Sequence, residues 1–312
     1  MFYRKILRSA LAFIAMLFLS TMAHAGLFRS YVSSTGSDVN PCSLSAPCRL
    51  LTAALAAVNV GGEIWMLDSV NYNTATVTIG KSVTILAVPG VVGSVLAIGG
   101  NAIDITTAGV KVALRNLVIV PFSGGGGVHG IEMTNGATLK VENCLIANLP
   151  GKCILINAPV VASVSDTIVR DNSAGIELDN GASATITRAH VVGNLNVGIW
   201  AVPSVASTVT AYVNDTVVNN NGYGIVASGA TGRLAKVYVT RTVASGNLYY
   251  GFYTYSANAV GDSYMELSGS VASRNSSGIY NFGSTFESAG DNRASGNTFA
   301  DVYGTVTITP SR

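Results

Sequence analysis

Short apolar runs recur at a nearly constant spacing through the second half of the chain. An apolar residue, most often preceded by Gly, marks each unit: Ile131, Ile154, Ile176, Ile199, Ile225, Phe252, Ile279 and Val302. Successive members are 22 to 27 residues apart, and an Asn precedes each member from Ile154 onward: Asn148, Asn172, Asn194, Asn221, Asn247, Asn275 and Asn297. The Asn and the apolar residue recur together although the spacing between units varies, which indicates an internal structural repeat.

Each unit contains two or three short apolar runs separated by Gly, Asn or Ser. Residues 175–178, 184–187 and 190–192 are an example, and in the first two runs apolar and polar positions alternate as in β-strands. Three such strands joined by tight turns make one coil of a right-handed parallel β-helix, whose coils lie about 4.8 Å apart. We therefore predict an all-β fold of this type, with the Asn side chains from Asn148 to Asn297 stacked along its axis.

The sequence of the N-terminal half predicts a capping helix and further coils of the β-helix. Residues 49–60 combine good helix formers with Pro47 just upstream, so we predict a helix that covers the open first coil. Residues 26–60 then form an N-terminal segment with this helix. Residues 61–312 form the β-helix, and at roughly 24 residues per coil they give about ten coils.

The first 25 residues are typical of a secretory signal peptide. Arg4, Lys5 and Arg8 precede an apolar core at residues 11–19, and Ala23-His24-Ala25 is a cleavage motif. We expect cleavage after Ala25 and a secreted or periplasmic location. No later run reaches the roughly 18 apolar residues of a spanning helix, so we expect no membrane span in the mature chain.

Composition narrows the classes of function. Charged residues make up 11% of the chain and hydrophobic residues 49%, against roughly 25% charged in average domains, which excludes an intrinsically disordered protein. Without residues 1–25 the balance is 18 − 3 = 15 Lys and Arg against 16 Asp and Glu, a net charge of about −1. No Lys/Arg cluster survives, so we expect no nucleic-acid partner.

The repeated units resemble the pectin-lyase-like group of the right-handed parallel β-helix superfamily. The resemblance covers residues 61–309 and depends on the Asn-to-Ile units at residues 172–176, 194–199, 247–252 and 275–279. Residues 31–38, with Asn40-Pro41-Cys42 and Pro47-Cys48, are similar to the start of secreted bacterial β-helix proteins. The resemblance implies the fold strongly and an activity weakly, because members include polysaccharide lyases, polygalacturonases, esterases, epimerases and proteins of unknown role.

The catalytic motifs of these enzymes are not matched. Trp65 is followed by Met-Leu-Asp68 without the His of the pectate-lyase-like Trp-x-Asp-His string. The nearest polygalacturonase-like matches, residues 128–130 and 214–216, differ in sequence and order. No catalytic residue is therefore carried over from the resemblance.

The repeat register itself supplies catalytic candidates. Six residues before the marker Asn lies a column of mostly charged residues: Glu142, Asp166, Arg188, Asp215, Arg241, Gly269 and Asp291. Glu142 and Asp166, stacked about 5 Å apart, would form a carboxylate pair such as retaining glycosidases use. The alternative is a ladder of opposite charges that stabilises neighbouring strands and runs through Asp166, Arg188, Asp215 and Arg241.

Outward positions of the C-terminal coils predict a binding face. Strand side chains alternate, so five aromatic residues point outward on one side: Trp200, Tyr253, Tyr255, Tyr280 and Phe282. Exposed rings suit the apolar faces of sugars, and Glu132, Glu177 and Asp179 make the same face acidic further upstream. The alternative is that these rings only stack on one another or lie beneath loops.

Four Cys follow the predicted signal peptide. Their even number favours disulfides, and the close spacings favour Cys42–Cys48 and Cys144–Cys153, although the sequence does not fix the connectivity. With two His left we expect no metal site and no cofactor.

Three classes of function follow. The first is a binding protein with an extended polysaccharide as its partner. The second is a carbohydrate-active enzyme, a polysaccharide lyase or a glycoside hydrolase, that uses Glu142, Asp166 or an Asp/Arg pair. The third is a structural or adhesion module without a ligand.

Overall fold

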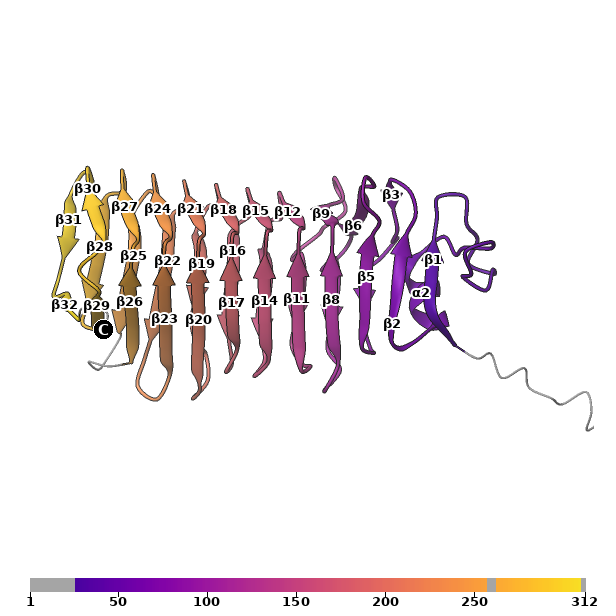
Figure 1. Ribbon diagram of the computed structural model, residues 1–312, viewed down its shortest axis with the longest axis horizontal. Coiled ribbons are helices and arrows are strands. Elements are labelled where there is room, and N and C mark those ends of the chain that lie inside the picture. The colour runs from indigo at the N-terminus through magenta and orange to yellow at the C-terminus, as the bar shows by residue number, and fades with distance from the viewer. Residues whose placement is uncertain (1–25, 257–261, 310–312) are drawn as a thin grey trace, which may run out of the picture.

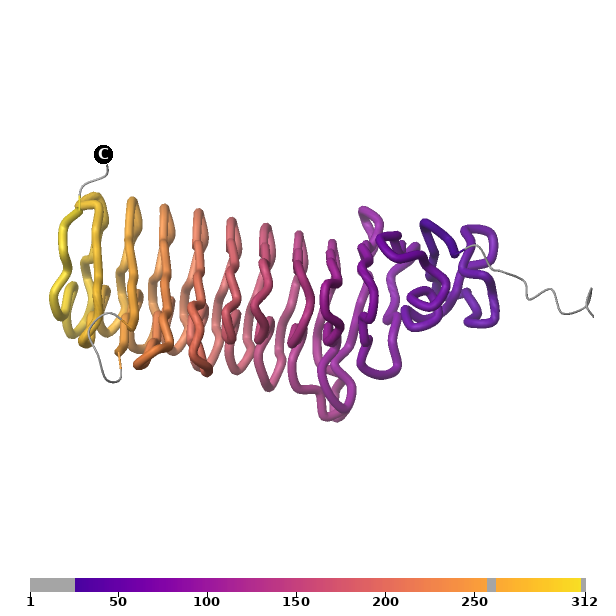
Figure 2. Tube along the Cα trace, turned by 90° about the horizontal axis from the view of Figure 1, so that it is seen from below, coloured from indigo at the N-terminus to yellow at the C-terminus, as the bar shows by residue number. Residues whose placement is uncertain are grey.

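The chain winds into a rod of three parallel β-sheets. The structure, a computed structural model, describes residues 26–256 and 262–309, so the predicted signal peptide lies outside the described residues. From residue 58 onward the chain visits the three sheets in turn, and every pair of neighbouring strands is parallel (Figure 1). Figure 2 shows the coils stacked along one axis. The predicted all-β parallel solenoid is confirmed.

The first sheet has twelve strands, and the other two have ten each. The strands of the first sheet are β1 (Leu27–Val32), β2 (Val58–Met66), β5 (Val83–Ala87), β8 (Lys111–Arg115), β11 (Thr138–Glu142), β14 (Val161–Ser165), β17 (Ser183–Thr187), β20 (Thr208–Asn214), β23 (Leu234–Thr240), β26 (Ser263–Ser268), β29 (Thr285–Ser288) and β32 (Thr307–Ile308). Those of the second sheet are β3 (Val70–Asn71), β6 (Gly93–Ala97), β9 (Leu117–Pro121), β12 (Leu145–Ala147), β15 (Ile168–Arg170), β18 (His190–Val192), β21 (Val217–Asn219), β24 (Val243–Ser245), β27 (Val271–Ser273) and β30 (Arg293–Ser295). Those of the third sheet are β4 (Val77–Thr78), β7 (Ile103–Ile105), β10 (Ile131–Met133), β13 (Lys152–Asn157), β16 (Ala174–Asp179), β19 (Val197–Ala201), β22 (Tyr223–Gly229), β25 (Tyr250–Ser256), β28 (Ser277–Phe282) and β31 (Ala300–Tyr303).

The helix α2 (Leu51–Ala57) is shorter than the predicted 49–60. Its buried Leu51, Ala54 and Leu55 join the apolar core at the N-terminal end of the rod. Val58 already has an extended backbone and starts β2, which pairs with β1. The β-branched Val58 and the partner strand favour this extended conformation over another helical turn. No helix in the described part of the chain is long and apolar enough to cross a membrane.

The marker residues of the repeat fill the core. The column from Ile131 to Ile279 lies in register on the third sheet and is at most 5% exposed. Val302, in the edge strand β31, is 49% exposed because no described strand pairs beyond it. Each coil buries one large apolar side chain in this column, which stabilises the folded state by about 1.5–3 kcal/mol per coil.

From Lys111 onward, most corners of the coils pass through a residue in the left-handed conformation. Between the first and second sheets these residues are Asn116, Asn143, Asp166, Arg188, Asp215, Arg241 and Gly269. Between the second and third sheets they are Asn148, Asp171, Gly193, Asn220, Gly246, Arg274 and Gly296. Gly and Asn tolerate this conformation, whereas Arg is strained in it, so an Arg at a corner requires a compensating contact.

The Asn ladder, defined as Asn172, Asn194, Asn221, Asn247, Asn275 and Asn297, follows the second corner. In each step the backbone N–H and the side-chain Nδ2 of one Asn donate to Oδ1 of the next, at 2.8–3.2 Å. The last member, Asn297, donates to Oδ1 of Asp301. The prediction that Asn148 belongs to the ladder is wrong: it is the exposed corner residue, and Leu149 occupies the ladder position.

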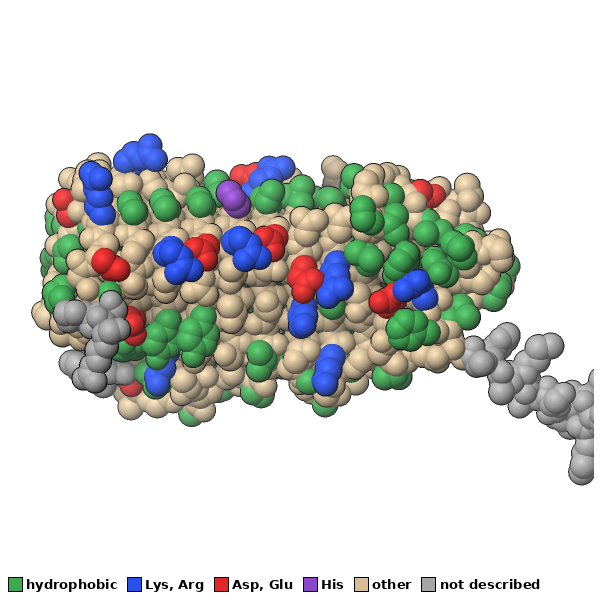
Figure 3. Space-filling model, viewed as in Figure 1, with side chains coloured by type: hydrophobic (Ala, Val, Ile, Leu, Met, Phe, Trp, Pro, Cys, Tyr) green, Lys and Arg blue, Asp and Glu red, His purple; other side chains and the backbone are tan. Residues whose placement is uncertain are grey.

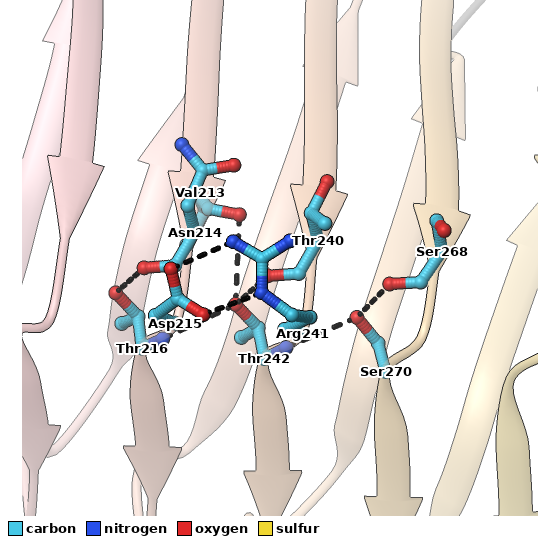
Figure 4. A network of polar contacts seen from close by, with 9 residues as sticks. All are labelled: Val213, Asn214, Asp215, Thr216, Thr240, Arg241, Thr242, Ser268 and Ser270. Atoms are coloured by element: carbon cyan, nitrogen blue, oxygen red, sulfur yellow. Dashed lines mark hydrogen bonds and ion pairs between the residues drawn. The ribbon is translucent and has the colours of Figure 1, made fainter.

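A second ladder of hydroxyl-type side chains follows the first corner. Thr216 N–H donates to Thr242, and Thr242 N–H donates to Ser270, at 3.4 and 3.2 Å (Figure 4). Cys144 holds the same position in an earlier coil, where its Sγ accepts the N–H of Leu117 at 3.5 Å. Burial raises the pKa of the Cys144 thiol to about 12, so the thiol stays protonated at neutral pH.

One of the two predicted disulfides is present. Cys42 and Cys48 are bridged, which is compatible with an extracellular location. The predicted Cys144–Cys153 bridge is wrong, because both are buried free thiols. Cys144 is engaged in the second ladder, while the Sγ of Cys153 lies 3.8 Å from the carbonyl oxygen of Ile146.

Candidate functional site

The outer face of the third sheet carries one column of side chains, with one member from each coil. Its members lie in unbroken register: Glu132, Leu155, Glu177, Trp200, Val226, Tyr253, Tyr280 and Tyr303. This is the outward column that the repeat period predicts. Parallel pairing therefore brings residues 22 to 27 positions apart into direct contact on this face.

A groove of about 450 Å³ follows this column. Its floor and walls include Lys152, Glu177, Trp200, Tyr223, Tyr253 and Tyr255. These residues come from β13, β16, β19, β22 and β25, which are successive neighbours in the third sheet (Figure 1). At about 4.8 Å per strand the groove extends over roughly 19 Å, so it suits an extended ligand.

Glu177 is a buried carboxylate that lines the groove. Its side chain is 7% exposed, and its Oε1 accepts a hydrogen bond from Nζ of Lys152 at 2.6 Å. Its other oxygen, Oε2, is buried and has no hydrogen-bond partner among the described residues. Burial raises the pKa of Glu177, and the nearby Lys152 opposes this effect without cancelling it.

His129 borders the groove beside Lys152. Its Nδ1 accepts the backbone N–H of Lys152 at 2.8 Å, so the neutral ring carries its proton on Nε2. Burial lowers the pKa of His129, which keeps the ring uncharged at neutral pH. The groove therefore has one paired cation and no charged imidazole at that pH.

Trp200 lies directly beside Glu177 in the next strand. The two residues are register partners, and the indole Nε1 of Trp200 is buried without a hydrogen-bond partner among the described residues. A donor and an acceptor, each buried and each unpaired, thus lie on adjacent strands of one groove. A buried polar group without a partner costs about 1–3 kcal/mol, so such groups are rare in native proteins.

The predicted aromatic residues divide between the groove and its continuation. Trp200, Tyr253 and Tyr255 line the groove, whereas Tyr280 and Phe282 lie in the following coil. There Tyr280 stacks on Tyr250 and Tyr303 at 4.1 and 4.4 Å, and Phe282 stacks on Tyr255 at 5.8 Å. Ring stacking between coils therefore occurs together with the groove.

The predicted catalytic candidates lie away from this groove, at the corner between the first and second sheets. The guanidinium of Arg188 makes two hydrogen bonds of 2.7 Å to Asp166, and Arg241 makes two of 2.6 and 2.8 Å to Asp215. Figure 4 shows the Asp215–Arg241 pair, and Figure 3 shows such pairs in a row along the rod. These pairs compensate for Arg in the strained corner conformation.

Glu142 does not stack on Asp166. Its register partner is Ser165, one residue earlier, and its Oε2 pairs with Nε of Arg115 at 2.7 Å. The predicted carboxylate pair is absent because Asn148 is a corner residue, one position before the ladder position at Leu149, so the residue six before it, Glu142, lies one register position ahead of Asp166. All four candidates are thus held in ion pairs.

The Asp166–Arg188 contact yields a titration prediction. Arg188 holds the pKa of Asp166 below its ordinary value of 3.8, so the contribution of the pair to stability is present above that value and lost as pH falls through the lowered one. We expect Arg188→Gln to raise the pKa of Asp166 toward 3.8, as measured by NMR titration of the carboxyl carbons. Arg241→Gln is the matched control, which shifts Asp215 and leaves Asp166 nearly unchanged. An Asp166 pKa that does not rise in Arg188→Gln would contradict the assigned cause.

Within residues 26–256 and 262–309, no group of three or more His, Cys, Asp or Glu side chains is arranged to hold a metal ion. The carboxylates of Asp104 and Glu132, upstream of the groove, instead both accept from Nδ2 of Asn101.

Sequence reasoning missed two residues of the groove. Lys152 pairs with Glu177, and Tyr223 stacks on Tyr253 at 5.9 Å. The signal for Glu177 was available, because the outward column places it directly beside Trp200. Lys152 gave no such signal, since it starts β13 and reaches across one coil to Glu177.

Comparisons with known proteins agree with the fold. Residues 94–214 match a family model described as a right handed beta helix region. The crystal structure of pectate lyase Pel9A superposes with a TM-score of 0.68 at 16% identity, covering 89% of this chain and 78% of that one. A complex of XylC with xylose (TM-score 0.56, 9% identity, 81% and 69% covered) and a rhamnogalacturonan lyase (TM-score 0.51, 14% identity, 90% and 86% covered) are also similar. A search of curated protein sequences gives no match.

Proposed function

We propose that this chain, a right-handed parallel β-helix protein, binds a polysaccharide in the groove of its third sheet. The observation that carries the proposal is the pair formed by Trp200 Nε1 and Glu177 Oε2. Both atoms are buried, both lack a hydrogen-bond partner among the described residues, and they belong to register partners. A ligand that donates and accepts hydrogen bonds at neighbouring points satisfies both.

Sugar rings have this chemistry. A hydroxyl group donates one hydrogen bond and accepts others, so adjacent hydroxyls can meet the indole N–H and the carboxylate oxygen together. The rings of Trp200, Tyr253 and Tyr255 offer flat apolar surfaces to the C–H faces of the same sugars. The length of the groove, over five strands, suits several linked sugars in an extended chain.

The names of the structural relatives support the same class of ligand. Two are lyases named for pectate and rhamnogalacturonan, and one is described with xylose. At 9–16% identity they share the fold with this chain, and no activity is transferred from them.

Glycoside hydrolysis is a second candidate function, favoured by the burial of Glu177. Burial raises the pKa of this carboxyl group, which is how proteins prepare a carboxylic acid to donate a proton to a leaving group. Release of reducing sugar by wild type but not by Glu177→Gln would support hydrolysis. Binding of the polymer without such release supports the binding function.

The binding function is tested by removing only the indole N–H. Wild-type protein is screened on an array of soluble polysaccharides, and Kd is measured by calorimetry for the polymer that binds most strongly. We expect Trp200→Phe to weaken that binding roughly tenfold, because it keeps an apolar ring and removes one buried donor.

Trp65→Phe is the matched control. Trp65 lies on the first sheet, where its Nε1 donates to Glu63 at 3.1 Å, and its replacement should leave Kd unchanged. A wild-type protein that binds none of the polymers, or an unchanged Kd for Trp200→Phe, would contradict the proposed function.

A further inference from the structure

We infer that the groove selects polysaccharides without acidic groups, and this inference rests on the proposed binding function. In the strands of the third sheet, as the structure describes them, Lys152 is the single cation. The same strands contain five carboxylates: Asp104, Glu132, Glu177, Asp179 and Asp301. The sheet that forms the groove is therefore acidic, with 1 − 5 = −4 formal charges before any protonation of Glu177.

Lys152 is not available to an acidic sugar. Its ammonium group lies 2.6 Å from Oε1 of Glu177, so binding of a uronate to Lys152 would have to replace an existing ion pair. His129, the other nitrogen base at the groove, uses Nδ1 as an acceptor and is kept neutral by burial. Among the described groove residues no unpaired cation meets a carboxylate or a sulfate.

The Oε2 oxygen of Glu177 would repel the carboxylate of an acidic sugar. The oxygen is buried and accepts no hydrogen bond from the described residues, and its residue is the register partner of Trp200. A sugar hydroxyl donates to it, whereas an ionised carboxylate in the same place has no proton to donate and carries the same charge. Like charges in a partly buried site are screened less than in water, which favours uncharged sugars over acidic ones.

The other acidic residues near the groove, Asp104, Glu132 and Asp179, already accept hydrogen bonds. Asn101 Nδ2 donates to Oδ1 of Asp104 at 2.8 Å and to Oε2 of Glu132 at 2.5 Å. Asp179 Oδ1 accepts the backbone N–H groups of Asn180 and Ser204, each at 2.5 Å. These carboxylates are held by amide donors, and no described cluster of three acidic or His/Cys ligands is arranged to bridge a cation to an acidic polymer.

The test uses pairs of polymers with one backbone and different charge. Polygalacturonate and alginate are each compared with their carboxyl-reduced, uncharged derivatives, together with uncharged xylan, galactan and glucomannan, with and without added CaCl₂. We expect the tightest binder to be uncharged, and each reduced polymer to bind roughly tenfold or more tightly than its parent. Added NaCl should not weaken binding of the uncharged polymer.

Glu177→Gln tests the residue that sets the selectivity. The amide keeps an acceptor oxygen and removes the charge, so we expect the preference for the uncharged member of each pair to fall roughly tenfold. Glu63→Gln is the matched control, because Glu63 is likewise paired with a cation, Arg29, but lies on the first sheet. Its selectivity should equal that of wild type.

The possible outcomes separate the two proposals. Tighter binding of an acidic parent polymer, with or without CaCl₂, overturns the inference and leaves the proposed binding function standing. Unchanged selectivity in Glu177→Gln also overturns it. Absence of binding to every polymer contradicts the proposed function itself and the inference with it.

Discussion

Replacing Asn221 by Ala is expected to lower the free energy of unfolding by about 4 kcal/mol. The Oδ1 of Asn221 accepts from the backbone N–H and Nδ2 of Asn194 at 3.0 and 2.8 Å. Its Nδ2 donates to the carbonyl of Val191 and to Oδ1 of Asn247, each at 3.1 Å. The substitution leaves these buried groups without partners in the middle of the rod, where water has no direct access to replace them.

The measurement is chemical unfolding at neutral pH, followed by circular dichroism. Asn196→Ala is the matched control, because Asn196 lies in the corresponding turn of the preceding coil, is exposed and makes one side-chain hydrogen bond, to Ser173. We expect it to cost less than about 0.5 kcal/mol. If both variants lose the same stability, the Asn ladder does not contribute as we describe.

Trp200→Ala is expected to weaken polysaccharide binding by about 30-fold or more, which corresponds to about 2 kcal/mol. The change removes the buried indole donor and the largest ring of the groove at once, beside Glu177, whose buried Oε2 has no hydrogen-bond partner among the described residues. Aromatic residues at the centre of a binding site typically carry such a share of the affinity. Titration calorimetry with the polymer selected on the array gives the two Kd values.

A second outward aromatic residue controls for general effects of removing a ring. Tyr212 is 43% exposed on the first sheet and stacks on Tyr238 at 5.1 Å. Tyr212→Ala should leave Kd unchanged and alter the melting temperature about as much as Trp200→Ala does. Equal loss of binding in both variants would show that the groove of the third sheet is not the binding surface.

The fold was predictable because a parallel solenoid repeats its environment. The inward column headed by Ile131 and the outward column with Glu177 and Trp200 follow from one period and from strand alternation. The error at Asn148 has a physical cause. An Asn favours the left-handed corner and also the ladder position immediately after it, so the residue type alone does not distinguish the two places.

The candidate site was predictable only in part. The repeat placed Trp200, Tyr253 and Tyr255 on one face, because their register follows from the period. It did not give the ion pair between Lys152 and Glu177, since a flexible side chain crosses one coil from the start of its strand. Nor did it give the free thiol of Cys144, because a thiol can replace a hydroxyl in the second ladder without a change in spacing.

The side-chain amides of the Asn ladder are aligned along the axis of the rod. Every amide in it donates one side-chain hydrogen bond toward the C-terminal side, and every oxygen points toward the N-terminal side, so these side-chain hydrogen bonds align head to tail as peptide groups do in a helix. The positive end of this row faces Asp301, and its hydrogen bonds from Asn297 lower the pKa of that carboxyl. The last coil thus ends the row of dipoles on an anion, the arrangement that stabilises a helix at its N-terminus.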